Sequence, residues 1–239
     1  MKPLATGLTI ALLWTHVCTG QTINDPARIE VYVIPYYNSA GPAINVGPFS
    51  QGLGTNSESA FLATISEMKK SWDRLTFTEV YVAAIRLYDM GFRNEAVYWF
   101  YSAQYRGRLL ATLLDPQKAG TIGDPGFELS HAQNAFQQLV GPYINGYAFG
   151  DIDHLIPVVE RVKKEGKTIP DLNKIYPGLS FKKKSEWESG NRELNDGLSK
   201  MLEMMRGQKA TIRQQRIETG VQARFSKLTS KELTKGSSQ

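Results

Sequence analysis

The feature that most constrains the fold is a stripe of small and apolar residues within positions 94–114. Neighbouring members lie three or four positions apart, which is the spacing of residues on one face of an α-helix. The pattern predicts a long buried helix that starts at Asn94, and its small members would let a second helix approach closely. The stripe consists of Ala96, Phe100, Ala103, Gly107, Leu110 and Leu114.

Four aromatic residues lie beside this stripe, namely Tyr98, Trp99, Tyr101 and Tyr105. Such rings either form a ligand-binding surface or pack in the core around the helix. Packing is the favoured interpretation, because each ring supplies a large apolar area to a core. We therefore expect this helix to be a structural element of the domain.

Two further helices are expected before the stripe. The first covers 57–72, where apolar residues recur at helical spacing. The second begins at Thr76, whose hydroxyl can cap the helix while Glu79 returns the hydrogen bond in a capping box. It ends at Met90, and Gly91 follows at a position suited to a left-handed cap. This helix and the next one therefore predict a helical hairpin.

The hairpin also carries small and aromatic residues at a characteristic spacing. They are Ala84, Leu87, Tyr88, Gly91, Glu95, Ala96, Trp99, Ala103, Gly107 and Ala111. Over 81–111 this spacing resembles the helix-turn-helix unit of tetratricopeptide-like repeat proteins, whose units stack into concave surfaces that bind proteins. One copy needs neighbouring helices to bury its apolar side. The resemblance therefore implies a repeat-like hairpin inside an irregular, mostly α domain.

Residues 1–20 have the pattern of a signal peptide for export. Lys2 supplies a positive start, an apolar run covers 4–17, and small residues lead to an expected cleavage site after Gly20. A retained N-terminal anchor and a lipid attached to Cys18 are the alternatives. Because Cys18 is the single cysteine, the mature chain would lack disulfides, which favours the bacterial periplasm over a secreted eukaryotic domain. We expect no transmembrane segment in the mature chain.

Residues 21–56 are expected to form an extended N-terminal segment. Within it, β-branched residues alternate over 28–34 and predict a short strand. Because one strand is unstable alone, it would pair with 43–46 or lie across the helices.

The helical domain is expected over 57–208, followed by a basic C-terminal helix or tail over 209–239. Another helix is predicted over 128–139, before a passage rich in glycine and aromatic residues that we interpret as a loop. Asp151 is the expected cap of a helix that reaches Lys164.

The last helix of this domain is expected to start with a capping box formed by Ser185 and Glu188. Its expected inward face consists of Leu194, Leu198, Met201, Leu202 and Met205.

The residues that carry chemistry do not match a known catalytic, metal or nucleotide-binding motif. His131 and His154 each lack a second histidine at the spacing of metal ligands, so both are interpreted as surface or capping residues. We expect no enzyme activity, no catalytic residue, no metal and no cofactor. The formal net charge is +5, but glutamates interleave with the basic clusters, which favours a solvated surface over nucleic-acid binding.

The export signal and the repeat-like hairpin together resemble periplasmic immunity proteins of type VI secretion systems. Some of those proteins neutralise phospholipase effectors and contain short helical repeats. The resemblance implies that the partner is a toxin, which the chain inhibits sterically by covering its surface. A periplasmic scaffold or assembly factor of an envelope complex is the alternative, and an envelope enzyme acting on a glycan or lipid is a third class.

Two aromatic passages are the candidate partner-binding sites, since buried aromatic anchors dominate many protein interfaces. Both are expected to be loops, and the alternative is that their side chains fold back on the helices. The candidate residues are Tyr36, Tyr37 and Asn38 in the first passage, and Tyr143, Asn145, Tyr147 and Phe149 in the second.

Overall fold

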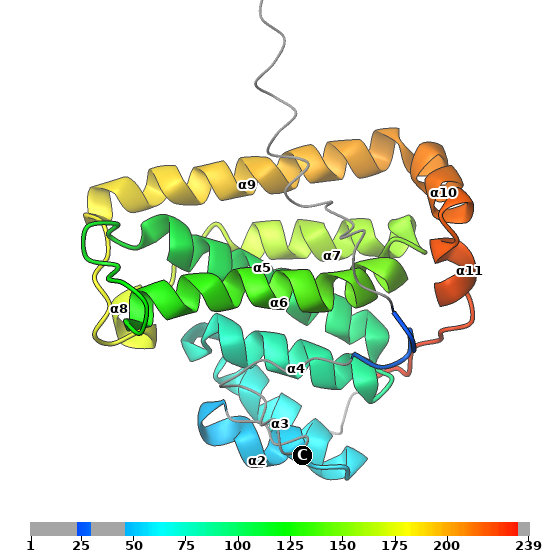
Figure 1. Ribbon diagram of the computed structural model, residues 1–239, viewed down its shortest axis with the longest axis horizontal. Helices are drawn as coiled ribbons and strands as arrows, with labels where there is room; N and C mark the ends of the chain where they lie inside the picture. Colours follow the sequence, from blue (N-terminus) through cyan, green and yellow to red (C-terminus); the bar gives the residue numbers. More distant parts are fainter. Residues whose placement is uncertain (1–22, 30–45, 234–239) are drawn as a thin grey trace, which may run out of the picture.

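The computed structural model describes residues 23–29 and 46–233, and this part of the chain is mostly helical (Figure 1). The mostly α prediction is therefore confirmed. The predicted signal segment 1–20 and nearly all of the predicted strand and its pairing segment lie outside the described residues. The elements are η1 (Gly47–Phe49), α2 (Ser50–Gly54), α3 (Glu58–Lys70), η2 (Trp72–Arg74), α4 (Phe77–Asp89), α5 (Arg93–Leu113), α6 (Pro125–Ala148), α7 (Ile152–Glu165), α8 (Leu172–Ile175), α9 (Lys184–Gly207), α10 (Lys209–Glu218) and α11 (Val221–Phe225).

The helical hairpin consists of α4 and α5, and its local signals act as predicted. The Glu79 N–H donates to the Thr76 hydroxyl at 3.2 Å, and the Thr76 N–H donates to the Glu79 carboxylate at 2.7 Å. This capping box fixes the start of α4. Gly91 has a φ of +91°, so the turn between the helices uses the left-handed conformation that glycine adopts without strain.

Helix α5 is the centre of the domain, because it packs against α4, α6, α7 and α9. The predicted stripe is buried along its whole length, and the four flanking aromatic residues are buried too. Core packing of these rings is therefore confirmed. Gly107 allows the close approach of α6, since a β-carbon at this position would lie 1.8 Å from Oε1 of Gln133.

The remaining helices surround this centre in layers (Figure 1). Helices α2 and α3 lie beyond α4, on the side away from α6, while α9 covers α7 on the opposite side of the domain. Helices α10 and α11 turn across one end of the stack. That end also contains the start of α5, the end of α6 and the start of α7.

Helix α6 is longer than expected. The prediction ended it at Leu139, but it continues through Gly141 and Pro142 to Ala148. Glycine and proline cost a helix interior about 1 and 3 kcal/mol, respectively. Burial of the face that carries Val140 and Ile144 offsets this cost. The passage interpreted as a loop is therefore the last part of a core helix.

The predicted start of α9 is also wrong. The helix begins at Lys184, and the carboxylate of Glu186 accepts the N–H of Lys183 at 3.2 Å, so Ser185 and Glu188 do not form the cap. The buried indole of Trp187 explains the shift. Its Nε1 donates to the Lys182 carbonyl at 2.9 Å, which holds the chain at the entry of the helix.

Two other predictions for this half of the chain are confirmed. Asp151 caps α7, because its Oδ1 accepts the N–H of His154 at 3.0 Å. Of the predicted inward face of α9, Leu198, Met201, Leu202 and Met205 are buried, and Leu194 is half-buried.

The C-terminal segment forms two short helices that dock on the domain. Phe225 of α11 is buried against α6, where a β-carbon at Gly146 would lie 2.4 Å from the Phe225 ring. Gly220, with a φ of +72°, forms the turn between α10 and α11. Of the two predicted forms of this segment, helix and tail, the helix is confirmed up to residue 225.

Candidate functional site

The candidate functional site is a set of three adjacent hollows at the end of the domain that α10 and α11 cover. The first hollow has a volume of about 320 Å³ and lies between the start of α5, the end of α6, the start of α7 and the two C-terminal helices. Its polar lining comes from Asn94, His154, Arg216, Gln222 and Ser226, among others. Side chains from four parts of the sequence therefore meet in this hollow.

Arg216 is the most unusual group in this hollow. It is only 8% exposed, and burial lowers the pKa of its guanidinium. Its Nη2 donates to the Gly146 carbonyl at 2.9 Å, and its Nε donates to Oε1 of Gln222 at 3.0 Å. Both acceptors are neutral. Among the residues that the structure describes, no carboxylate forms an ion pair with Arg216.

The second hollow is adjacent to the first. It has a volume of about 770 Å³ and shares Asp151, Arg216 and Gln222 with the first hollow. Ile217 of α10 lines it and is 52% exposed, and among the described residues only Ile122 is another large apolar side chain with such exposure. Phe149 lines the same hollow.

Basic side chains line the α10 wall of this second hollow. Lys209 forms an ion pair with Asp153 at the start of α7, which ties α10 to the domain. Arg213, one turn further along α10, is exposed and also lines the hollow. The second hollow thus combines apolar and cationic groups with two aspartates, Asp151 and Asp153.

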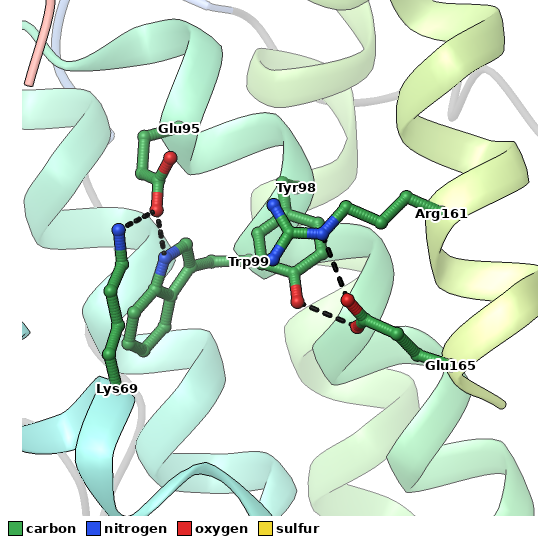
Figure 2. Close-up of polar contacts among 6 residues, drawn as sticks. All are labelled: Lys69, Glu95, Tyr98, Trp99, Arg161 and Glu165. Atoms are coloured by element: carbon green, nitrogen blue, oxygen red, sulfur yellow. Dashed lines mark hydrogen bonds and ion pairs between the residues drawn. The ribbon is translucent and has the colours of Figure 1, made fainter. Parts of the chain in front are cut away.

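The third hollow lies along α7 in the other direction. It has a volume of about 410 Å³ and shares Asn94 and His154 with the first hollow. Its wall includes the guanidinium of Arg161, which lies 3.7 Å from the centroid of the Tyr98 ring. Figure 2 shows how Glu165 joins these two side chains, since its carboxylate accepts from the Tyr98 hydroxyl at 2.7 Å and from Arg161 at 2.9 Å.

This wall continues inward as a stack of aromatic and cationic groups. Trp72 stacks on Tyr98 with ring centroids 5.5 Å apart, and the guanidinium of Arg106 lies 4.6 Å from the Trp72 ring. Cations over aromatic faces are attracted by the ring quadrupole. Burial, together with the neighbouring Glu165, raises the pKa of the Tyr98 hydroxyl, which keeps it a hydrogen-bond donor. The stack therefore makes the wall of the third hollow rigid.

A second polar cluster secures the same part of α5. The indole of Trp99 donates to Glu95 at 2.9 Å, and Lys69 of α3 pairs with the same carboxylate oxygen at 2.7 Å (Figure 2). Glu95 also lines the third hollow. These contacts hold α3 against the start of α5.

The segment after α11 closes one side of the third hollow. Its backbone is fixed at the turn between α4 and α5, where the Lys231 N–H donates to the Gly91 carbonyl at 2.8 Å and the Asn94 N–H donates to the Ser230 hydroxyl at 2.9 Å. Arg93 adds a hydrogen bond to the Thr229 carbonyl. The C-terminal segment is thus part of the site's wall.

The structure brings some of the predicted partner-binding residues to this site. Tyr147 lines the first hollow, where its hydroxyl donates to Oδ1 of Asn94 at 2.8 Å, and Phe149 lines the second. Tyr143 is 2% exposed and lies inside the domain, where Asn145 accepts a hydrogen bond from the Tyr101 hydroxyl at 2.9 Å. The expected loop is wrong because all four side chains belong to α6 or its C-cap.

The first predicted passage, Tyr36, Tyr37 and Asn38, lies outside the described residues. Sequence reasoning missed Arg216, Ile217 and Gln222. The sequence gives little indication that this segment docks on the domain, because Phe225 is the single aromatic residue between 209 and 233.

The described residues contain no group of three or more His, Cys, Asp or Glu side chains placed to hold a metal ion. His131 is exposed on α6 near the Phe127 ring, and His154 is exposed on α7. In the same part of the chain, no helix has the length and apolar character needed to cross a membrane.

Comparison with known proteins gives one relative, an uncharacterized protein of Haemophilus influenzae. It is 27% identical over 177 residues, which cover 72% of this chain and 66% of that protein. The chain therefore spans just under two thirds of the length of this relative. No family model and no solved structure matches the chain. The function is therefore inferred from the geometry of the site and from the sequence.

Proposed function

We propose that this protein binds another protein through the three hollows, and that it is a periplasmic immunity protein that inhibits a secreted antibacterial toxin. The observation that carries the binding role is the second hollow. It places exposed Ile217 beside Phe149 and Arg213. Aromatic and arginine side chains around an apolar centre are enriched in protein interfaces and supply most of their binding energy.

The arrangement of the hairpin supports placing the interface at this end of the domain. In stacked repeat proteins the concave face of the hairpins binds the partner. Here α6, α7 and α9 cover α5, so the hairpin acts as the core that positions the surrounding helices. The partner then binds where α6, α7 and α10 meet.

Inhibition would be steric. The partner's surface would be covered by a rigid wall, because the stack of Arg161, Tyr98 and Trp72 and the docked C-terminal segment require no rearrangement on binding. Preorganised surfaces lose less conformational entropy and therefore bind more tightly. The identity of the partner as a toxin, including a phospholipase, follows from the resemblance described for the sequence.

The test has two stages. Tagged protein from Gln21 onward is incubated with a lysate of the source organism, and the retained proteins are identified by mass spectrometry. A stoichiometric partner is then purified, and its hydrolysis of phospholipid or other envelope substrates is measured against increasing amounts of this protein. Complete inhibition at a one-to-one ratio is the expected result.

A matched pair of variants locates the interface. Ile217→Arg should weaken partner binding at least tenfold, because it places a charge at the centre of the apolar contact. Ile122→Arg is the control, since Ile122 is the other large apolar side chain that is exposed among the described residues, at 85%. Equal binding by both variants would exclude the second hollow. If the captured proteins are subunits of an envelope complex and this protein does not inhibit any activity of theirs, the scaffold alternative is favoured.

A further inference from the structure

The buried guanidinium of Arg216 lacks a counter-charge in the part of the chain that the structure describes. Taking a charge out of water is costly, and buried charges are therefore usually paired. Arg216 is held in place by Gly146 and Gln222, but these neutral acceptors leave its full positive charge in the hollow. A site built in this way is prepared for an anion.

Other groups around the first hollow suit the same ligand. The side-chain amides of Gln222 and Asn94 line it and can donate hydrogen bonds to an anionic oxygen, whereas the Ser226 hydroxyl, which also lines it, donates to the Ala223 carbonyl at 3.1 Å. Asp151 also lines it, but one of its oxygens accepts the N–H of His154, and the carboxylate stabilises the start of α7. The hollow, at about 320 Å³, is large enough for a side chain and shares Arg216 and Gln222 with the larger second hollow.

The second hollow indicates that the anion belongs to a protein. Exposed Ile217 and Arg213 extend the surface beyond the first hollow. A free carboxylate would leave this apolar and basic surface uncovered, whereas an acidic side chain on a protein segment would fill the first hollow while its neighbours cover Ile217. Charge-assisted bonds between arginine and carboxylate are also among the strongest in protein interfaces.

We propose that the hollow around Arg216 is the anchor pocket of the interface and accepts the carboxylate of an aspartate or glutamate side chain from the partner. This inference rests on the protein-binding role proposed above and adds the chemistry of the partner's anchor. The carboxylate replaces water at the guanidinium of Arg216 and leaves the hydrogen bonds to Gly146 and Gln222 in place.

The experiment uses the protein from Gln21 onward and needs no partner. Nuclear magnetic resonance follows the Nε–Hε signal of Arg216 and the side-chain amide of Gln222 during titration with N-acetyl-glutamic acid amide. The isosteric N-acetyl-glutamine amide and inorganic phosphate are titrated in parallel. We expect a saturable shift with the glutamic acid probe and binding at least tenfold weaker with the glutamine probe.

One variant blocks the pocket while it preserves the fold. In Gln222→Glu, a carboxylate of the chain itself would occupy the position that accepts the Nε hydrogen bond of Arg216 and would neutralise the guanidinium. This variant should lose the response to the glutamic acid probe without a lower melting temperature. Arg224→Gln, at an exposed position of α11, changes the net charge by the same amount and should bind the probe normally.

Three results would overturn the anchor pocket. They are equal responses to the glutamic acid and glutamine probes, an unchanged response in Gln222→Glu, and binding of phosphate that is tighter than that of the glutamic acid probe. The last result would assign the hollow to a phosphate-bearing ligand. Because no partner is used, failure here is distinguishable from failure of the proposed function, which is tested by capture and inhibition.

Discussion

Replacing Asp89 by asparagine should stabilise the protein at neutral pH and remove part of its pH dependence. Asp89 is the last residue of α4, and its Oδ1 accepts the N–H of Ile29 at 2.8 Å, which holds the N-terminal segment against the hairpin. Burial raises the pKa of this carboxyl from 3.8 to about 6, against the opposing effects of that hydrogen bond and of Arg86, Arg28 and Arg93. Asparagine keeps an oxygen for the Ile29 N–H and removes the buried charge.

The raised pKa of Asp89 links the free energy of unfolding to pH. The folded state holds the proton of Asp89 more tightly than the unfolded state does, so this group's contribution to stability is present in full below pH 3.8 and is lost as the pH rises through about 6. The shift corresponds to about 3 kcal/mol over the full range. Between pH 7.5 and 5 the part recovered is about 1.4 kcal/mol.

Urea unfolding, followed by circular dichroism at several pH values, measures this effect. Other carboxylates also titrate, so the quantity to compare is the difference between the wild-type protein and Asp89→Asn. This difference should favour the variant at pH 7.5 and shrink by about 1.4 kcal/mol at pH 5. Asp196→Asn, at an exposed position of α9, controls for the amide substitution itself. Parallel stability curves for the wild type and Asp89→Asn would refute the reasoning.

Three further substitutions test the packing that positions the site. Gly107→Ala should lower the free energy of unfolding by about 1–3 kcal/mol, because its β-carbon would overlap Gln133. Chemical unfolding measures this loss, and an unchanged midpoint would mean that α5 and α6 are less closely packed. Gly146→Ala should displace the Phe225 ring and expose α11. Faster amide hydrogen exchange in 221–225, with little change in α4 and α5, is the expected result, whereas uniform exchange would contradict it. Tyr98→Phe removes the hydrogen bond to Glu165 and should cost about 1 kcal/mol in stability, measured by urea unfolding of the variant and the wild type, and equal free energies of unfolding would contradict it.

The sequence was sufficient for the hairpin because its signals are local. The capping box of Thr76 and Glu79, the left-handed Gly91 and the stripe on α5 each depend on residues within one or two turns. Local signals gave wrong helix boundaries where tertiary contacts outweigh them, at the end of α6 and at the start of α9. The glycine- and aromatic-rich passage after Leu139 suggested a loop, but burial of the face that carries Val140 and Ile144 keeps α6 intact to Ala148. Ser185 suggested a cap, but the burial of Trp187 shifts the start of α9.

The candidate site was harder to predict because it depends on contacts between distant segments. Arg216 lies 70 residues from its hydrogen-bond acceptor Gly146, and the Asn94 N–H lies 136 residues from the hydroxyl of Ser230. A basic, polar segment with one aromatic anchor looks like a solvated tail in the sequence. It docks because Gly146 leaves room for the ring of Phe225, and this docking buries Arg216.

The same docking buries Arg216, which has no ion-pair partner among residues 23–29 and 46–233. The side chain of Arg216 is buried and held by Gly146 and Gln222, at the cost of desolvation of its guanidinium. A cation placed in this way stabilises a complex more than it stabilises the free protein, because its pairing with a carboxylate occurs only on binding. On this reasoning, the partner should increase the melting temperature of the wild-type protein more than that of Gln222→Glu, in which the charge is already neutralised.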